Sequence, residues 1–183
     1  MDVKIFIAGP RAIPNLNKSV EEKLYGIYEK DHVVLVGDAD GIDKAVQGFF
    51  SAVNYGNVIV YASNGKARNN LGKWPVEAIR VSGQTKGFDF YAAKDEAMAN
   101  SADYGFMIWN GESKGTLNNI VNLLNGKKNV LVFFSPHNTF VSLDSFDKLD
   151  ILLLSCSAKA KAFTEKLRRN PTNAQKQMAL FDN

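Results

Sequence analysis

The chain has 183 residues, of which 45% are hydrophobic and 22% charged, a composition typical of one globular domain. No apolar run approaches the roughly 20 residues needed to span a bilayer, and the single cysteine, Cys156, excludes an internal disulfide. The N-terminus has no signal-peptide pattern, so we expect a cytoplasmic protein with no membrane partner.

The net charge of +3 is distributed unevenly along the chain. Residues 157–183 hold six Lys or Arg against two acidic residues, so the rest of the chain is close to neutral. A nearly neutral body argues against a nucleic-acid-binding surface as the main role of the fold.

Five short apolar runs without polar alternation predict strands that are covered on both faces: residues 3–9, 32–37, 57–63, 104–111 and 129–135. Between these runs, helical patterns occupy residues 17–31, 41–56, 89–103 and 115–128. This alternation predicts an α/β fold, a Rossmann-like, doubly wound and mostly parallel sheet of five or six strands in a core of residues 1–135. In such sheets, ligands bind beyond the carboxyl ends of the strands.

Residues 64–88 form a long excursion rich in turn residues, which we interpret as a flap over the site with a short strand at 79–82. Residues 143–169 have a helical pattern in two segments and complete a single domain of residues 1–169 as a C-terminal extension. The polar stretch 170–183 contains a proline and is predicted to be a flexible tail.

Two glycine-containing turns follow the first two predicted strands. In the first, Gly9 and Pro10 allow a tight turn, and Arg11 offers donors to a phosphate or carboxylate; the alternative is a plain turn with a solvent-facing arginine. The second turn holds candidate ligand contacts at the start of a helix: Gly37, Asp38, Asp40, Gly41 and Asp43. Its carboxylates suit ribose hydroxyls, although helix capping explains one or two of them. The spacing does not match a calcium loop, so we expect no metal and no cofactor.

The flap and the following helix add further candidates. Arg68 is a possible ligand contact, and Trp74 either packs on a base or, as we favour, anchors the loop. Asp95 is placed to orient a sugar or to cap a neighbouring element. Its alternative is an exposed charge pair with Lys94, which at this spacing hardly interacts in a helix.

The stretch WNGESKGTLNNI, residues 109–120, places a glycine-rich turn between a strand and a helix. Backbone N–H groups at such a helix start suit a phosphate or a sugar. The candidate ligand contacts here are Asn110, Gly111, Ser113, Gly115, Thr116 and Asn119.

The segments KIFIAGP, GDADGIDKA, DEAMANSADYGFMIWNGESKGTLNNI and KKNVLVFF occur in an order that resembles the SLOG superfamily of Rossmann-like nucleotide-binding proteins. That superfamily includes the Lonely Guy phosphoribohydrolases, the nucleoside deoxyribosyltransferases and an uncharacterised bacterial and phage branch. The resemblance covers residues 1–135 and implies a pocket for a nucleotide or a nucleotide-derived signal, with its phosphate near 113–116.

The resemblance also bears on catalysis. In the catalytic relatives a glutamate follows the Gly-Thr pair by three residues and attacks, or helps water attack, the anomeric carbon. This chain has Asn119 there, and an amide is neither a carboxylate nucleophile nor a base near neutral pH. Asp95 and Glu112 are the weak alternative candidates for a catalytic carboxylate. Binding without cleavage is therefore the favoured interpretation.

A separate motif lies in the tail. The peptide QMALF resembles the short sequence by which bacterial proteins dock on the replication sliding clamp, through Gln177, Leu180 and Phe181. The alternative is a hydrophobic tip that folds back on the body.

Three functions thus remain open. The first is binding of a nucleotide or nucleotide-derived small molecule, in sensing, sequestering or handling. The second is N-glycosidic hydrolysis or (deoxy)ribosyl transfer, and the third is an adaptor docked on the sliding clamp. A homodimer is expected only by analogy with relatives of this fold.

Overall fold

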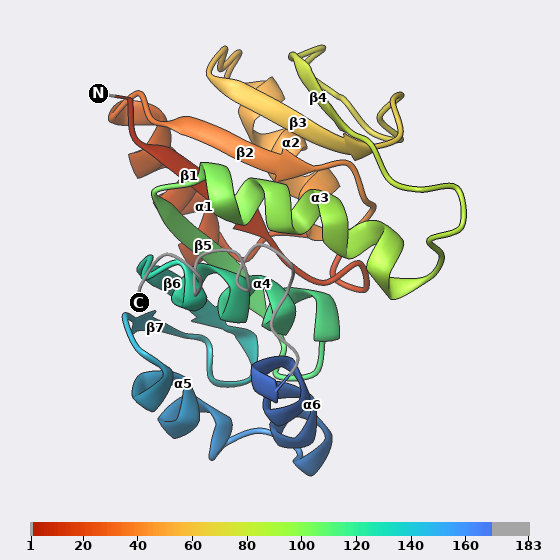
Figure 1. Cartoon of the computed structure of the whole chain (residues 1–183). Helices are drawn as coiled ribbons and strands as arrows, with labels where there is room; N and C mark the ends of the chain where they lie inside the picture. Colours follow the sequence, from red (N-terminus) through yellow and green to blue (C-terminus); the bar gives the residue numbers. More distant parts are fainter. Residues whose placement is uncertain (1, 170–183) are drawn as a thin grey trace.

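The computed structural model describes residues 2–169 and centres on a seven-stranded sheet with the order β4-β3-β2-β1-β5-β6-β7 (Figure 1). The strands are β1 (Lys4–Ala8), β2 (Val33–Gly37), β3 (Val58–Ser63), β4 (Val76–Ile79), β5 (Tyr104–Trp109), β6 (Val130–Phe134) and β7 (Thr139–Leu143). All neighbouring strands pair in parallel except β7, which runs antiparallel to β6. The doubly wound, mostly parallel α/β fold predicted from the sequence is confirmed.

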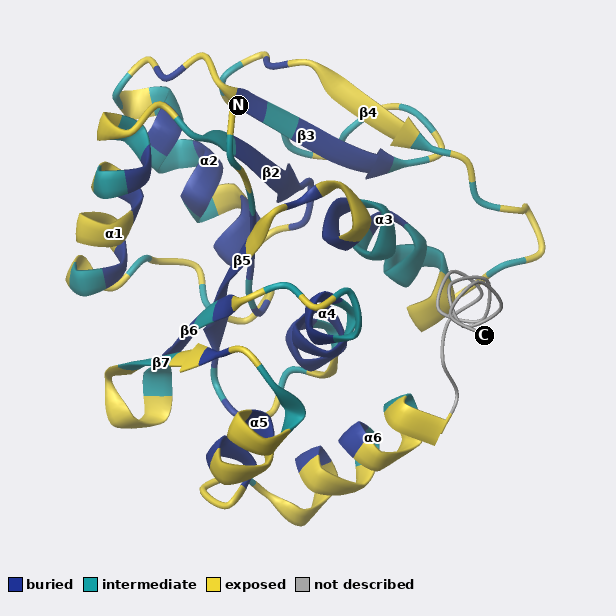
Figure 2. Ribbon diagram, turned by 60° about the vertical axis from the view of Figure 1, so that its left-hand side comes forward, coloured by how far each residue is buried: buried dark blue, intermediate teal, exposed yellow. Residues whose placement is uncertain are grey.

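Four helices cover the two faces of the sheet. They are α1 (Lys18–Glu29), α2 (Ile42–Ala52), α3 (Phe88–Ser101) and α4 (Lys114–Asn125). On one face, α1 and α2 bury side chains such as Leu24 and Phe50 against the sheet, and on the other α3 and α4 bury Met98 and Ile120 (Figures 1 and 2). The apolar spacing in the sequence fits this arrangement, since each helix buries one stripe.

The order of the strands creates a switch point beside β1. The chain builds outward from β1 through β2 and β3 to β4, and then returns to place β5 on the other side of β1. The register pairs Ala8 with Met107, so the turns that follow β1 and β5 leave the sheet side by side. Open α/β sheets bind ligands at such a point.

The sheet has two more strands than the five apolar runs suggested, and one more than the upper expectation of six. The edge strand β4 lies within the excursion 64–88 at Val76–Ile79, slightly before the expected 79–82. The other edge strand, β7, was not predicted. Both edges carry mostly exposed or half-buried residues, so neither has the continuous apolar pattern of a central strand.

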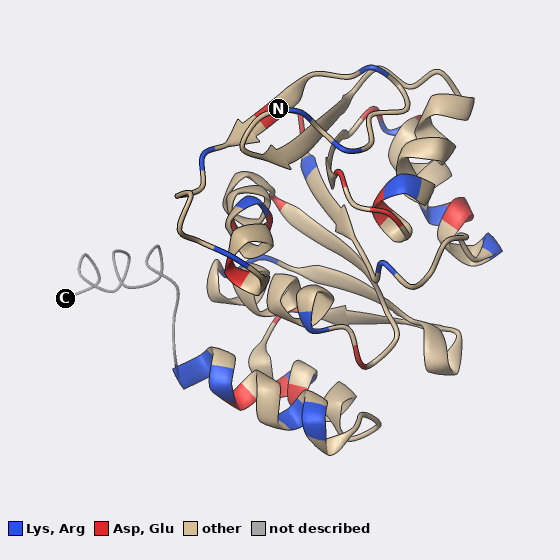
Figure 3. Ribbon diagram, turned by 90° about the vertical axis from the view of Figure 1, so that its right-hand side faces the viewer, with Lys and Arg blue, Asp and Glu red and all other residues tan. Residues whose placement is uncertain are grey.

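The C-terminal extension consists of α5 (Phe146–Leu153) and α6 (Ala158–Arg169), preceded by a short 3₁₀ turn at Ser135–His137 and by β7. This matches the two helical segments expected within 143–169. Lys and Arg recur along α6 (Figure 3). Among residues 2–169, no helix combines the length and apolar character required to cross a membrane. The predicted flexible tail and its clamp-like peptide, with Gln177, Leu180 and Phe181, lie outside the described residues.

Candidate functional site

A cavity of about 570 Å³ opens at the switch point, between the N-terminal halves of α3 and α4 and over the carboxyl end of β1. The turns after β1 and β5 supply two of its walls, and it is also lined by Ala39 from the turn after β2 and by Asp43 from the first turn of α2. Eleven of the residues singled out in the sequence line it: Gly9, Pro10, Arg11, Asp43, Asp95, Asn110, Glu112, Ser113, Gly115, Thr116 and Asn119. The predicted turns therefore converge on one cavity.

Six other candidates do not line the cavity: Gly37, Asp38, Asp40, Gly41, Arg68 and Gly111. Gly41 has a structural role instead. It has a φ of 77°, and a Cβ there would meet the backbone of Arg11, so it lets the turns after β1 and β2 pack together. Gly41 is also the N-cap of α2, which means that helix capping does not account for the aspartates of this turn.

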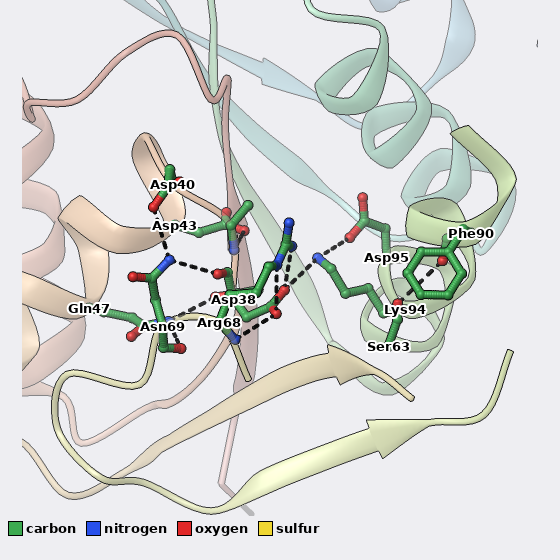
Figure 4. Close-up of polar contacts among 12 residues, drawn as sticks. Asp38, Asp40, Asp43, Gln47, Ser63, Arg68, Asn69, Phe90, Lys94 and Asp95 are labelled. Carbon is green, nitrogen blue, oxygen red and sulfur yellow. Dashed lines mark hydrogen bonds and ion pairs between the residues drawn. The ribbon is translucent and has the colours of Figure 1, made fainter. Parts of the chain in front are cut away.

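Asp38 is paired with Arg68 (Figure 4), and neither residue lines the cavity. Arg68 donates from Nε to Oδ2 at 2.9 Å and from Nη2 to Oδ1 at 2.7 Å, and its backbone N–H also donates to Oδ2 at 3.1 Å. Burial alone raises the pKa of Asp38, but these hydrogen bonds outweigh it and hold the pKa below its usual range. The pair ties the excursion after β3 to the turn after β2.

The remaining aspartates of this turn also have protein partners. Asp40 is exposed and accepts from the Asn69 side chain at 3.1 Å. Asp43 is buried and accepts from the Ala39 N–H at 3.3 Å. Burial raises the pKa of Asp43 to about 6, although the positive charge of Lys94 opposes the shift.

Lys94 is buried and interacts electrostatically with Asp43 and Asp95, and all three line the cavity. Its side chain is 4% exposed, and Nζ lies 2.9 Å from Oδ1 of Asp95 and 3.9 Å from Oδ1 of Asp38 (Figure 4). Burial lowers the pKa of Lys94, but the surrounding carboxylates outweigh it and raise the pKa above the usual value. The idea of an exposed, non-interacting Lys94–Asp95 pair was wrong.

Arg11 and Arg68 share one aromatic ring at the cavity. The guanidinium carbon of Arg11 lies 4.4 Å from the ring centre of Tyr91, and that of Arg68 lies 5.1 Å from it. Arg68 is neutralised by Asp38, whereas no carboxylate among residues 2–169 lies within ion-pair distance of Arg11. Arg11 is exposed and lines the cavity, so it presents an uncompensated positive charge to a ligand.

The turn before α4 uses part of its own hydrogen-bonding capacity. The Asn110 side chain accepts from the N–H groups of Glu112 at 3.0 Å and Ser113 at 2.8 Å. Ser113 is the N-cap of α4, and its hydroxyl accepts from the N–H of Thr116 at 3.4 Å. The backbone N–H groups of Ser113 and Thr116, which the sequence suggested for a phosphate, thus donate to side chains of the loop itself. The positive end of α4 still faces the cavity at Gly115.

Two buried polar residues of α4 line the cavity. Thr116 is 2% exposed, and its hydroxyl donates to Oγ of Ser113 at 3.0 Å. Asn119, one turn further on, is 3% exposed, and its Oδ1 is enclosed without a hydrogen-bond partner among the described residues. A buried polar atom of this kind is rare, because native structures satisfy nearly all such groups.

Several cavity residues were not anticipated as contacts from the sequence. Helix α3 contributes Phe88, Tyr91, Lys94 and Met98, which together form one long wall. Their spacing of three, three and four residues places them on one helical stripe, a signal that could have marked Lys94 as inward-facing. Trp74 does not line the cavity; it is 7% exposed and donates from Nε1 to the Tyr55 carbonyl at 2.7 Å, so it anchors the excursion as favoured.

The described residues hold no group of three or more His, Cys, Asp or Glu side chains that could bind a metal ion. The cavity itself presents an arginine at the rim, a lysine and carboxylates in one wall, and an amide in another.

Comparison with solved structures finds similarity to DNA processing protein A from Helicobacter pylori, described for its unique single-stranded DNA binding mode. The TM-score is 0.57 and the identity 14%, over 91% of this chain and 80% of that chain. At this identity the likeness shows a shared Rossmann-like fold alone. No protein-family model and no curated protein matches the chain.

Proposed function

We propose that the cavity between α3 and α4 binds a nucleotide or a nucleotide-derived small molecule. The observation that carries the proposal is the convergence of the turns after β1, β2 and β5 on one cavity of about 570 Å³, a size suited to such a ligand. Its position at the switch point of a doubly wound sheet supports the same conclusion.

The charges of the cavity suggest how the ligand lies. Arg11 and the positive end of α4 favour an anionic group, such as a phosphate, at the rim. Asp43 and Asp95 are able to accept hydrogen bonds from sugar hydroxyls further in. The motif order that resembles the SLOG superfamily agrees with this assignment, and we propose membership of that superfamily on the same grounds.

The binding proposal is tested with the purified chain. Mass spectrometry of ligand released on denaturation identifies anything carried through purification, and calorimetric titration with ribo- and deoxyribonucleoside 5′-monophosphates measures affinity. We expect a Kd below about 1 mM for at least one nucleotide, and a loss of about tenfold in Arg11→Ala. The exposed Arg80, which does not line the cavity, provides the control Arg80→Ala. A chain that purifies empty and binds no nucleotide would overturn the proposal.

A second candidate function is cleavage at the N-glycosidic bond of a nucleotide. It is favoured by two carboxylates that line the same cavity as Arg11, the half-buried Asp95 and the exposed Glu112. In this reaction the bond between the anomeric carbon and the base breaks, water supplies the new bond to oxygen, and the base leaves with a proton. Asn119, in place of a glutamate, argues for binding as the first choice.

Chromatography separates the two candidates. Incubation with each nucleoside monophosphate releases free base if the chain is a hydrolase, and Asp95→Asn then lowers that release by about 10²-fold or more. Intact nucleotide after prolonged incubation, together with measurable binding, favours the binding function alone.

Two macromolecular roles are tested beside these. DNA processing protein A, which has a similar fold, binds single-stranded DNA, so the same titrations include a single-stranded oligonucleotide. The nearly neutral body of this chain does not favour binding of a long polyanion. The adaptor role rests on the QMALF peptide, and a clamp pull-down with and without residues 171–183 tests it. Equal retention of both forms would exclude that role.

A further inference from the structure

Asn119 is the one residue of the described cavity wall whose side chain has an enclosed polar atom without a partner. Its Oδ1 is shielded from solvent and accepts no hydrogen bond from residues 2–169. A buried carbonyl oxygen in this state has lost its water without gaining a donor, which destabilises the ligand-free fold. Such a cost is typical of functional sites, where a ligand completes the interaction.

The neighbouring polar groups do not share this deficit. Thr116, one turn earlier on the same face of α4, already donates to Ser113 at 3.0 Å. Lys94 and Asp95 on helix α3 pair with each other, with 2.9 Å between Nζ and Oδ1. Among the described lining residues, Oδ1 of Asn119 is therefore the one enclosed polar atom with no hydrogen-bond partner at all.

The burial of the lining residues distinguishes the rim of the cavity from its inner wall. Arg11, Gly87 and Glu112 are exposed and form its rim. The inner wall consists of residues that are at most 6% exposed: Ala8, Ala39, Lys94, Met98, Thr116 and Asn119. An anionic group is best placed at the rim, near the arginine and the helix start. The part of the ligand that reaches Asn119 is then its uncharged end.

We propose that Asn119 is the specificity-determining residue of this cavity and that its amide hydrogen-bonds an uncharged, N–H- or O–H-bearing group of the ligand. Rotation about the last side-chain bond presents either Oδ1 or Nδ2, so a group that offers a donor beside an acceptor fits best. A base edge and a pair of sugar hydroxyls both have this chemistry. The inference rests on the proposed nucleotide-binding function.

Helix α4 itself supplies a matched control. Asn122 lies three residues after Asn119, and its Nδ2 is likewise enclosed without a partner among the described residues. Asn122 does not line the cavity. Replacing either amide by leucine removes an unsatisfied buried atom and adds a better helix former, but only the change at Asn119 touches the ligand.

The experiment compares wild type, Asn119→Leu and Asn122→Leu by thermal melting without ligand and by calorimetric titration with the tightest-binding nucleoside monophosphate. We expect both variants to melt at or above the wild-type temperature. We expect Asn119→Leu to lose about tenfold in affinity and Asn122→Leu to bind as wild type does. Asn119→Ala repeats the comparison with a smaller side chain if leucine prevents folding.

Ribose 5-phosphate, titrated beside the nucleotide, identifies the group that meets Asn119. An affinity loss for both ligands assigns a sugar hydroxyl, and a loss for the nucleotide alone assigns the base edge. Unchanged nucleotide affinity in Asn119→Leu would overturn the inference while leaving the binding function intact. So would a melting temperature clearly below that of Asn122→Leu, because the amide would then be structural. Failure of the wild type to bind any nucleotide would overturn the binding function itself.

Discussion

Arg68 holds Asp38 with two side-chain hydrogen bonds, of 2.9 and 2.7 Å, and so joins the excursion after β3 to the turn after β2. Both residues were candidates for ligand binding in the sequence, yet neither lines the cavity. The two charges neutralise each other. Asp38 is 3% exposed, so it depends on this partner, whereas the side chain of Arg68 remains 41% exposed.

We expect Arg68→Ala to lower the free energy of unfolding by about 2 kcal/mol, because it leaves Asp38 buried with only part of its compensation. The partial exposure of Arg68 keeps the effect below that of a fully buried pair. Urea denaturation measures the loss, and Arg80→Ala, at an exposed position of the same excursion, is the control. Similar stability in the two variants would show that the pair does not hold the excursion.

Asp43 predicts a pH dependence of stability. Its pKa is about 6 in the folded chain against the ordinary value of 3.8, so between these values the folded state keeps a proton that the unfolded state has lost. Raising the pH from well below 4 to well above 6 therefore lowers the free energy of unfolding of wild type relative to Asp43→Asn, by about 3 kcal/mol in total. Urea titrations of both proteins at several pH values measure the difference, and a flat or rising difference would contradict it.

Lys94 compensates Asp43 and Asp95 from a buried position, so its removal is expected to be costly. Lys94→Met should destabilise the chain by about 3–5 kcal/mol at pH 8, where both carboxylates are charged. The loss should shrink near pH 5, because Asp43 then takes up a proton. Chemical denaturation at the two pH values tests this, with the exposed Lys44→Met on α2 as control. An equal loss at both values would exclude this role for Lys94.

The sequence predicted the parts of the fold that depend on local pattern. The central strands are continuous apolar runs, and the helix α4 (Lys114–Asn125) buries Leu117 and Ile120 as their spacing indicates. The edge strand β7 escaped prediction because four of its five residues are exposed or half-buried and it pairs only with β6. Its formation depends on a neighbouring strand rather than on its own composition.

The site was predictable as a set of turns but not as a set of contacts. Gly9, Arg11 and Asn119 line the cavity as expected, since the turns after parallel strands meet at one edge. Asp38 and Lys94 exchanged their expected roles, because pairing between charges on different elements decides which one faces a ligand. The helical stripe of α3 marks Lys94 as inward-facing, but a single sequence carries no local signal for its partners on other elements.

Gly9 predicts a steric effect rather than a conformational one. A Cβ at this position would lie 2.7 Å from Cγ1 of Ile42 and 2.9 Å from the carbonyl oxygen of Ile108, which belongs to a central strand. The strand cannot shift freely, so Gly9→Ala should lower the free energy of unfolding by about 1–3 kcal/mol and narrow the cavity that Gly9 lines. Gly26→Ala on α1 is the matched control, since a Cβ there meets nothing within 4 Å. It should stabilise the chain by about 0.5–1 kcal/mol through helix propensity. Urea denaturation of the two variants compares these opposite signs directly, and a neutral Gly9→Ala would mean that the turn after β1 moves more easily than its packing against Ile42 and Ile108 implies.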